Sequence, residues 1–158
     1  MFGLLGPYMA MEESLGKYEN RKSIMTPDEY MECWNFFRLV RESKGYDIQS
    51  FPSCIEDWVS HALAPIPMDL VCGSRRPLYC DEIARALETI NAEAVWHGEA
   101  YEFGEHVNVV KSNFHPVTLL TFTVKRVGDG EVETAQAMIF RKRDCIRLSV
   151  MEWRFKPK

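Results

Sequence analysis

The sequence predicts an α+β fold, in which an antiparallel sheet of four to five strands wraps over one long helix behind an N-terminal helical extension. Three observations lead to this prediction. A helical pattern covers residues 80–94, the hydrophobic period changes from 3.6 to 2 at Tyr101, and short turn-forming segments separate the alternating runs that follow. A helix followed by such a meander is typical of an antiparallel sheet packed on that helix.

The chain has 158 residues and a formal net charge of −4. A single domain of this size removes roughly 70% of the unfolded chain's surface from water, so it can bury a real core. The acidic balance argues against a polyphosphate-binding surface over the whole protein, although Lys and Arg gather in residues 141–158. We therefore disfavour nucleic acid as a partner and keep an acidic protein or a nuclear-import factor as alternatives for the basic segment.

Cysteine usage and the N-terminal residues both favour an intracellular protein. The five cysteines are odd in number and lack close pairs, which is typical of reduced thiols. The apolar start, MFGLLGPYMAM, has no basic lead-in and runs into Glu12, so we expect no signal peptide. No stretch approaches the roughly 20 apolar residues of a membrane span, so we expect no membrane contact and a cytoplasmic or nuclear location.

The first clear element is a helix over residues 27–43. Thr26 is placed to cap its first N–H groups, Pro27 suits the first helical position, and Glu29 completes a capping box. Gly45 supplies the C-terminal stop.

Aromatic residues on this helix make it a candidate partner-binding surface. Trp34, Phe36 and Phe37 lie on more than one face of the predicted helix. One face should pack on the domain, and another is free to meet a protein partner or a second copy of the chain. Burial of both faces within one molecule is equally consistent with the pattern.

A short second helix is predicted over residues 53–63, and Pro65 and Pro67 follow it. We expect an extended connection after Pro67, with one strand near 68–72. The organisation along the chain is then a partly irregular segment over residues 1–25, a helical preface packed on the domain over 26–73, and the main helix with its sheet over 74–158.

The main helix, predicted over residues 80–94, has one narrow apolar face. Ile83, Leu87, Ile90 and Ala94 recur at helical spacing, and the acidic residues near the start suit the positive end of the helix dipole. His97-Gly98 closes the helix.

Alternating residues then predict four strands joined by three short connections, which are NFHP at residues 113–116, GDG at 128–130 and RKRD at 141–144. The first two strands place apolar residues on the inner face and polar residues on the outer face. The predicted inner residues are Phe103, Val107, Val109, Leu120, Phe122 and Val124, and the polar ones are Glu102, His106, Asn108, Thr121, Thr123 and Lys125. The third strand covers Val132 to Phe140, and the last contains Ile146, Leu148 and Val150.

Several short segments resemble plant cystatins and, more closely, uncharacterised plant families of cystatin-like fold. They are A86-L-E-T-I-N91, Y101-E-F103, V109-V-K-S-N113, T121-F-T-V124 and E133-T-A-Q-A137, together with Y18-E-N20, T26-P-D-E-Y30 and R41-E-S-K-G-Y-D47 upstream. The resemblance implies a cystatin/monellin-type fold, with one long helix gripped by an antiparallel sheet, and a plant source.

Plant cystatins inhibit papain-like cysteine proteases through a wedge made of an N-terminal segment and two hairpin loops. The first loop, Gln-x-Val-x-Gly in those inhibitors, falls on F114-H-P-V-T-L119, where Val117 is matched but the Gln and the Gly are not. The second, Pro-Trp in those inhibitors, falls on the charged run that begins with Arg141, Lys142 and Arg143. Four consecutive charged residues suit a desolvated protease contact poorly, so we expect the inhibitory wedge to be lost.

No catalytic or metal-binding set emerges from the sequence. His115 lacks a nucleophile at a predicted neighbouring position, and a turn histidine is the simpler interpretation. His97, His106 and His115 fall on elements that do not converge, and Cys54, His61, Cys72 and Cys80 match no paired zinc spacing. We expect no metal and no cofactor.

The sequence thus favours a non-enzymatic protein-protein interaction module of cystatin-like fold. The candidate partner-binding residues are Phe114, His115, Pro116, Val117, Arg141, Lys142 and Arg143 in the loops, and Trp34, Phe36 and Phe37 on the first helix. The alternative is an inhibitor of papain-like cysteine proteases with an altered wedge. A ligand carrier or enzyme that uses the hollow of the curved sheet also stays open.

Overall fold

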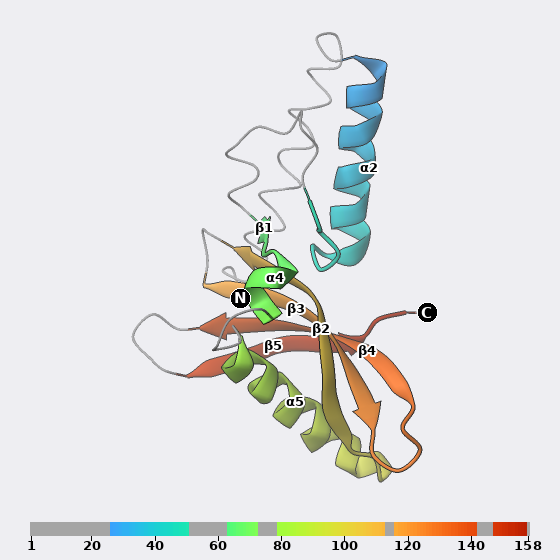
Figure 1. Cartoon of the computed structure of the whole chain (residues 1–158), viewed down its shortest axis with the longest axis vertical. Coiled ribbons are helices and arrows are strands. Elements are labelled where there is room, and N and C mark those ends of the chain that lie inside the picture. Colours follow the sequence, from blue (N-terminus) through green and yellow to red (C-terminus); the bar gives the residue numbers. More distant parts are fainter. Residues whose placement is uncertain (1–25, 51–62, 73–78, 113–115, 142–146, 158) are drawn as a thin grey trace.

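A computed structural model describes residues 26–50, 63–72, 79–112, 116–141 and 147–157 (Figure 1). The elements in chain order are α2 (Pro27–Ser43), β1 (Leu63–Pro65), α4 (Met68–Cys72), α5 (Cys80–Ala94), η1 (Val95–His97), β2 (Tyr101–Ser112), β3 (Val117–Arg126), β4 (Val132–Arg141) and β5 (Leu148–Phe155). The five strands form one antiparallel sheet in the order β1-β2-β3-β4-β5, and helix α5 packs on it. The predicted α+β fold is confirmed.

Helix α2 has the predicted bounds and the predicted cap. The Glu29 N–H donates to the Thr26 side-chain oxygen at 3.1 Å, which satisfies one of the free N–H groups of the first turn. At the other end Lys44 takes the left-handed conformation, and the N–H of Gly45 donates to the Val40 carbonyl at 3.0 Å. Gly45 itself has a φ of +88°, which explains why glycine follows the helix.

The structure corrects the prediction for residues 63–72. Leu63, placed at the end of a predicted helix, begins strand β1, and the strand expected near 68–72 is the short helix α4; residues 53–62 lie outside the described residues. The Pro67 carbonyl accepts from the N–H groups of Leu70 and Val71 at 3.0 and 3.3 Å. Proline therefore opens a helical turn here, while pairing with β2 draws Leu63 into the sheet.

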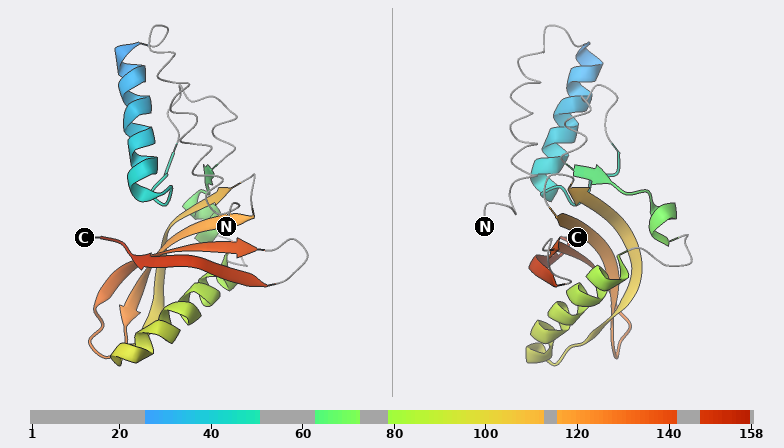
Figure 2. Two further views of the ribbon diagram at one scale, coloured as in Figure 1. Left: turned by 180° about the vertical axis from the view of Figure 1, so that it is seen from behind. Right: turned by 90° about the vertical axis from the view of Figure 1, so that its left-hand side faces the viewer.

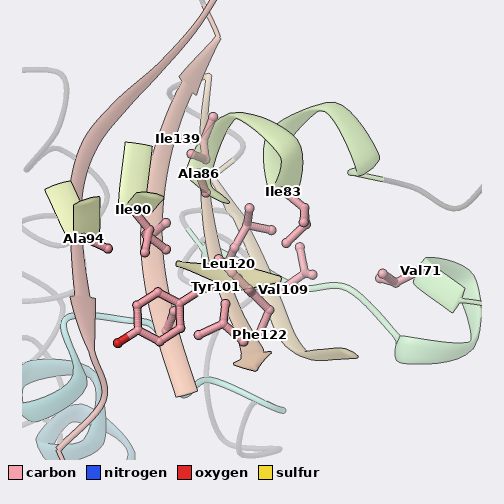
Figure 3. Packing of buried hydrophobic residues seen from close by; sticks show 13 residues of the cluster. Val71, Ile83, Ala86, Ile90, Ala94, Tyr101, Val109, Leu120, Phe122 and Ile139 are labelled. Carbon is pink, nitrogen blue, oxygen red and sulfur yellow. The ribbon is translucent and has the colours of Figure 1, made fainter. Parts of the chain in front are cut away.

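Helix α5 covers one face of the sheet with a continuous apolar cluster (Figure 3). Ile83, Ile90 and Ala94 are buried as predicted, whereas Leu87 is only partly buried and Ala86 is fully buried. The cluster's sheet residues are Tyr101, Val109, Leu120, Phe122, Val124, Ala135, Ala137 and Ile139. The helix ends through η1, and Gly98 caps it with a φ of +70°.

A second apolar cluster packs against the opposite face of the sheet. It joins Cys33, Phe36, Phe37 and Val40 of α2, Tyr46 and Ile48 of the following turn, and Leu63, Val110, Val117, Leu119 and Met138 of the sheet. Adjacent residues such as Val109 and Val110 belong to different clusters, because successive strand residues point to opposite faces. The two clusters thus lie on opposite faces of the sheet, and the sheet curves around α5 on its inner side (Figure 2).

Strand β2 departs from the predicted alternation. Its register with β3 shifts between Phe103 and His106 and again between His106 and Asn108. Such bulges change which face each side chain occupies. His106, predicted to be outside, therefore shares the inner face with its partner Phe122, and Val107, predicted to be inside, is exposed. Phe103 precedes the bulges and keeps the inner face opposite Val124, but it is 39% exposed at the edge. Asn108 stays on the outer face, where its bonds to the Tyr46 and Ile48 carbonyls bury it.

Strand β3 follows the prediction: Leu120, Phe122 and Val124 are all fully buried. Ile146, expected in the last strand, lies outside the described residues.

Candidate functional site

An apolar groove lies between helices α4 and α5 and the bulged part of strand β2. Its volume is about 540 Å³, which is in the range of clefts that bind ligands. The residues that line it are Val71, Cys72, Cys80, Ile83, Ala84, Leu87, Phe103, Gly104, Glu105 and His106.

The first half of α5 forms the helical wall of this groove. Ile83 is buried against the sheet, whereas Leu87 is only partly covered and leaves apolar surface facing the groove. Helix α4 contributes Val71, which is fully buried, and Cys72, which is exposed. The apolar stripe of α5 is therefore wider than the area that the sheet covers.

Gly104 shapes the strand wall. A Cβ at this position would lie 2.3 Å from the Thr123 Oγ1 atom, closer than any side chain allows. The same Oγ1 accepts a hydrogen bond from the Glu105 N–H at 2.9 Å, so the backbone bends onto Thr123. This bulge places Phe103 and His106 together in the groove lining, with their ring centroids 5.3 Å apart.

His106 supplies a polar atom to this apolar surface. Burial lowers the pKa of His106 below its ordinary value, so the imidazole is neutral near pH 7. Its Nδ1 atom is buried and has no hydrogen-bond partner among the described residues. The neutral ring therefore carries unused hydrogen-bonding capacity within the groove lining.

Within the described ranges, the outer edge of β2 carries no partner strand beside the groove. Strand β1 pairs only with Val110–Ser112, and one further bond joins the Ile66 N–H to the Val109 carbonyl at 2.8 Å. Over residues 101–108, no strand of the described ranges pairs with this edge. Figure 2 (right) shows β2 along the outer rim of the curved sheet. Its outward N–H and C=O groups are available to an added strand.

Exposed carboxylates surround the groove. Asp69 on α4, Asp81 on α5, and Glu102 and Glu105 on β2 are all exposed. On α5, Arg85 pairs with Glu88 at 3.1 Å, which offsets the charge of this cation. The groove is therefore apolar inside and negative at its rim.

The predicted loop residues are only partly described, and those that are lie together at one end of the sheet. Phe114, His115, Lys142 and Arg143 lie outside the described residues. The Arg141 N–H donates to the Pro116 carbonyl at 2.9 Å, so the two connections approach each other there. Pro116 is exposed, but Val117 is buried in the cluster under α2 and offers no surface to a partner.

Arg141 is engaged within the molecule. Its Nη2 atom lies 2.6 Å from the Oε1 atom of Glu82, a buried carboxylate in the first turn of α5. A charge-assisted bond to a buried partner holds this guanidinium against the helix. The pair ties the end of β4 to α5, so the guanidinium would have to break it to bind elsewhere.

Of the three candidate partner-binding residues on helix α2, only Trp34 is exposed. Phe36 and Phe37 are buried and pack edge to face, with their centroids 5.5 Å apart, so they serve the core. Trp34 is 36% exposed and lines a cavity of about 290 Å³ with Met31, Asn35, Arg38 and Arg41.

Sequence reasoning missed the groove between α5 and β2. Its walls come from three segments that are distant in the sequence, and their approach depends on the bulges of β2. A glycine within the Y101-E-F-G-E-H run was the available signal, because an isolated glycine in a strand often marks a bulge or a close backbone approach.

Within the described ranges, no group of three or more His, Cys, Asp or Glu side chains could hold a metal ion. None of the helices in those ranges is both long enough and apolar enough to span a membrane. No family model, curated protein or solved structure matches the chain.

Proposed function

We propose that this protein is a non-enzymatic interaction module that binds an extended segment of a partner protein in the groove between α5 and β2. One observation carries the proposal: an apolar groove has a helix as one wall and, as the other, a strand whose outer edge is unpaired among the described residues. Peptides that add a strand to an open sheet edge gain affinity from main-chain hydrogen bonds and specificity from side-chain pockets.

The groove chemistry defines the segment that fits. Leu87 and Phe103 favour an apolar or aromatic anchor, because burying such a side chain contributes about 1.5–3 kcal/mol. Glu102 and Glu105 at the rim favour Lys or Arg beside that anchor, since opposite charges steer association and exclude acidic competitors. The expected ligand is therefore an extended peptide with an apolar anchor and basic flanks.

A cystatin-like fold is part of this proposal. The chain order of one strand, one long helix and a four-strand meander supports it, as does the way the sheet curves around α5. The same arrangement is what the resemblance to plant cystatins implies.

Selection from a phage-displayed library of random linear peptides tests the groove. We expect enriched peptides to combine an apolar or aromatic residue with Lys or Arg, and to shift the NMR signals of the amides of residues 102–107. Phe103→Glu should weaken their binding by about tenfold or more, because it places a charge in the apolar lining.

Val132→Glu is the matched control for this experiment. It puts the same charge on an exposed strand position that does not line the groove, and should leave binding unchanged. The proposal is wrong if no peptide is enriched, if Phe103→Glu binds as the wild type does, or if the shifted amides lie elsewhere.

Inhibition of papain-like proteases is the second candidate function, and the contact between Pro116 and Arg141 favours it. That contact brings the connections at residues 113–116 and 141–144 to one end of the sheet. This end, at Ser112 of β2, is about 30 Å along the strand from Phe103 in the groove. Titration against papain separates the two functions: inhibition lost on replacement of residues 114–118, but kept in Phe103→Glu, would establish the inhibitor.

A further inference from the structure

Trp96 is the most exposed large apolar residue of the described ranges, at 86%. It follows α5 in η1, beside Val95, which is also exposed. Trp is enriched among the interface residues that contribute most to binding. An exposed Trp also gains favourable free energy when a partner removes its large apolar surface from water.

The backbone that carries Trp96 is held firmly. The Asn91 side chain donates to the Tyr101 carbonyl at 2.9 Å and accepts from the Tyr101 N–H at 2.7 Å. The Val127 N–H donates to the Ala100 carbonyl at 2.8 Å, which joins this segment to the β3–β4 turn. A side chain on such a support loses little backbone freedom on binding.

The surroundings of Trp96 are acidic. Glu93 is exposed on the last turn of α5, and Glu99 follows η1. On the adjoining turn, Asp129 and Glu131 each lie 3.1 Å from one Arg126 nitrogen, and Glu99 is 3.9 Å from another. The single Arg126 guanidinium thus faces three carboxylates, and the surface around Trp96 keeps a net negative charge.

The cavity on α2 has the opposite character. Met31 and Trp34 give it apolar walls, and the exposed Arg38 adds positive charge. At about 290 Å³ it suits one aromatic ring rather than a whole ligand. An indole ring there would contact Trp34 and the Arg38 guanidinium, both favourable neighbours for an aromatic face.

Helix α2 and the C-terminal end of α5 lie at opposite ends of the molecule, so one chain cannot bring the two surfaces together (Figure 1). We propose that Trp96 of one copy inserts into the Met31–Trp34–Arg38–Arg41 cavity of a second copy. The contact uses two different surfaces, so molecules associate head to tail and each added copy leaves one surface of each kind open.

Sedimentation velocity across micromolar to millimolar concentrations tests this contact. The wild type should form dimers and then longer species as its concentration rises. Trp96→Ala and Arg38→Glu should each weaken association by about tenfold or more, with melting temperatures like that of the wild type because both sites are exposed.

Mixing the two variants gives the sharpest result. The Trp96→Ala chain keeps an intact α2 cavity, and the Arg38→Glu chain keeps an intact Trp96, so an equimolar mixture should form a 1:1 dimer that does not grow. Met151→Ala, at an exposed site on β5, should associate as the wild type does. A wild type that stays monomeric, a Trp96→Ala variant that still associates, or a mixture without the dimer would overturn the proposal.

Discussion

Helix α5 is held on one face of the sheet chiefly by apolar contacts, whereas the turn after helix α2 is held on the opposite face by polar side chains as well. On the α5 side, Ile90, Leu120 and Phe122 are fully buried in a single apolar cluster. On the other side, the Asn108 side chain donates to the carbonyls of Tyr46 and Ile48 at 2.9 and 2.8 Å.

Further polar bonds extend this second attachment. The Gln136 side chain is fully buried, donates to Asp47 at 3.1 Å and accepts from Arg154 at 2.9 Å. Burial holds the pKa of Tyr46 far above its ordinary value, so its hydroxyl stays protonated and donates to Glu152 at 3.2 Å.

The two attachments differ in what they contribute. Apolar burial supplies most of the stability of a domain and tolerates small changes of position. A buried hydrogen bond adds only about 0.5–1.5 kcal/mol, but its loss leaves a buried group unsatisfied. We infer that α5 stabilises the sheet, while the polar side chains fix where the 44–48 turn sits.

The largest expected effect comes from the α5 side. Phe122→Ala should lower the free energy of unfolding by about 3–5 kcal/mol, because it empties a fully buried site between α5 and the sheet. Urea denaturation measures the change. Val132→Ala, at an exposed site, should stay within about 0.5 kcal/mol of the wild type, and an equal loss in both variants would refute the difference between the sites.

A smaller and more local effect is expected from Asn108→Ala. It leaves two buried carbonyls without donors, at a cost of about 1–3 kcal/mol for each unsatisfied group. Hydrogen exchange should show the added opening in residues 44–48 and in α2, while the α5 amides change only with global stability. Uniformly faster exchange would show that the two attachments do not act separately.

The smallest effect concerns pH on the groove side. Burial lowers the pKa of His106 in the folded state, so the folded protein favours the neutral imidazole. The contribution of the neutral ring to the free energy of unfolding is fully present above the unfolded-state pKa. It is lost as the pH falls through the folded-state pKa. We expect the urea midpoint of the wild type to fall between about pH 7 and pH 5 more than that of His106→Gln. Equal pH dependence in both proteins would contradict this assignment.

Sequence patterns predicted the parts of this fold whose signals are local. Thr26 and Pro27 located the start of α2, and the spacing of Ile83 and Ile90 located the buried face of α5. Strand β3 followed its alternation because its pairing with β4 is regular.

The remaining features depend on contacts between distant segments. The burial of Asn108 depends on carbonyls about sixty residues away, which no local pattern could indicate. The bulges turned His106 to the inner face, beside the groove, and left Val107 exposed, against the predicted alternation. Of the candidate partner-binding residues on α2, Phe36 and Phe37 are buried in the core. The sequence could not predict this, because periodicity alone does not tell which of two aromatic faces is covered.

The bulge at Gly104 also bears on the solubility of the protein. A flat, open strand recruits the same strand of a neighbouring molecule, and repeated pairing of that kind grows into fibrils. In β2 the register breaks twice, and Glu102 and Glu105 place like charges along the exposed stretch, so stacking of identical edges is opposed both by shape and by repulsion. The irregularity at Gly104 thus opposes the edge-to-edge pairing of identical β2 strands through which such aggregation begins.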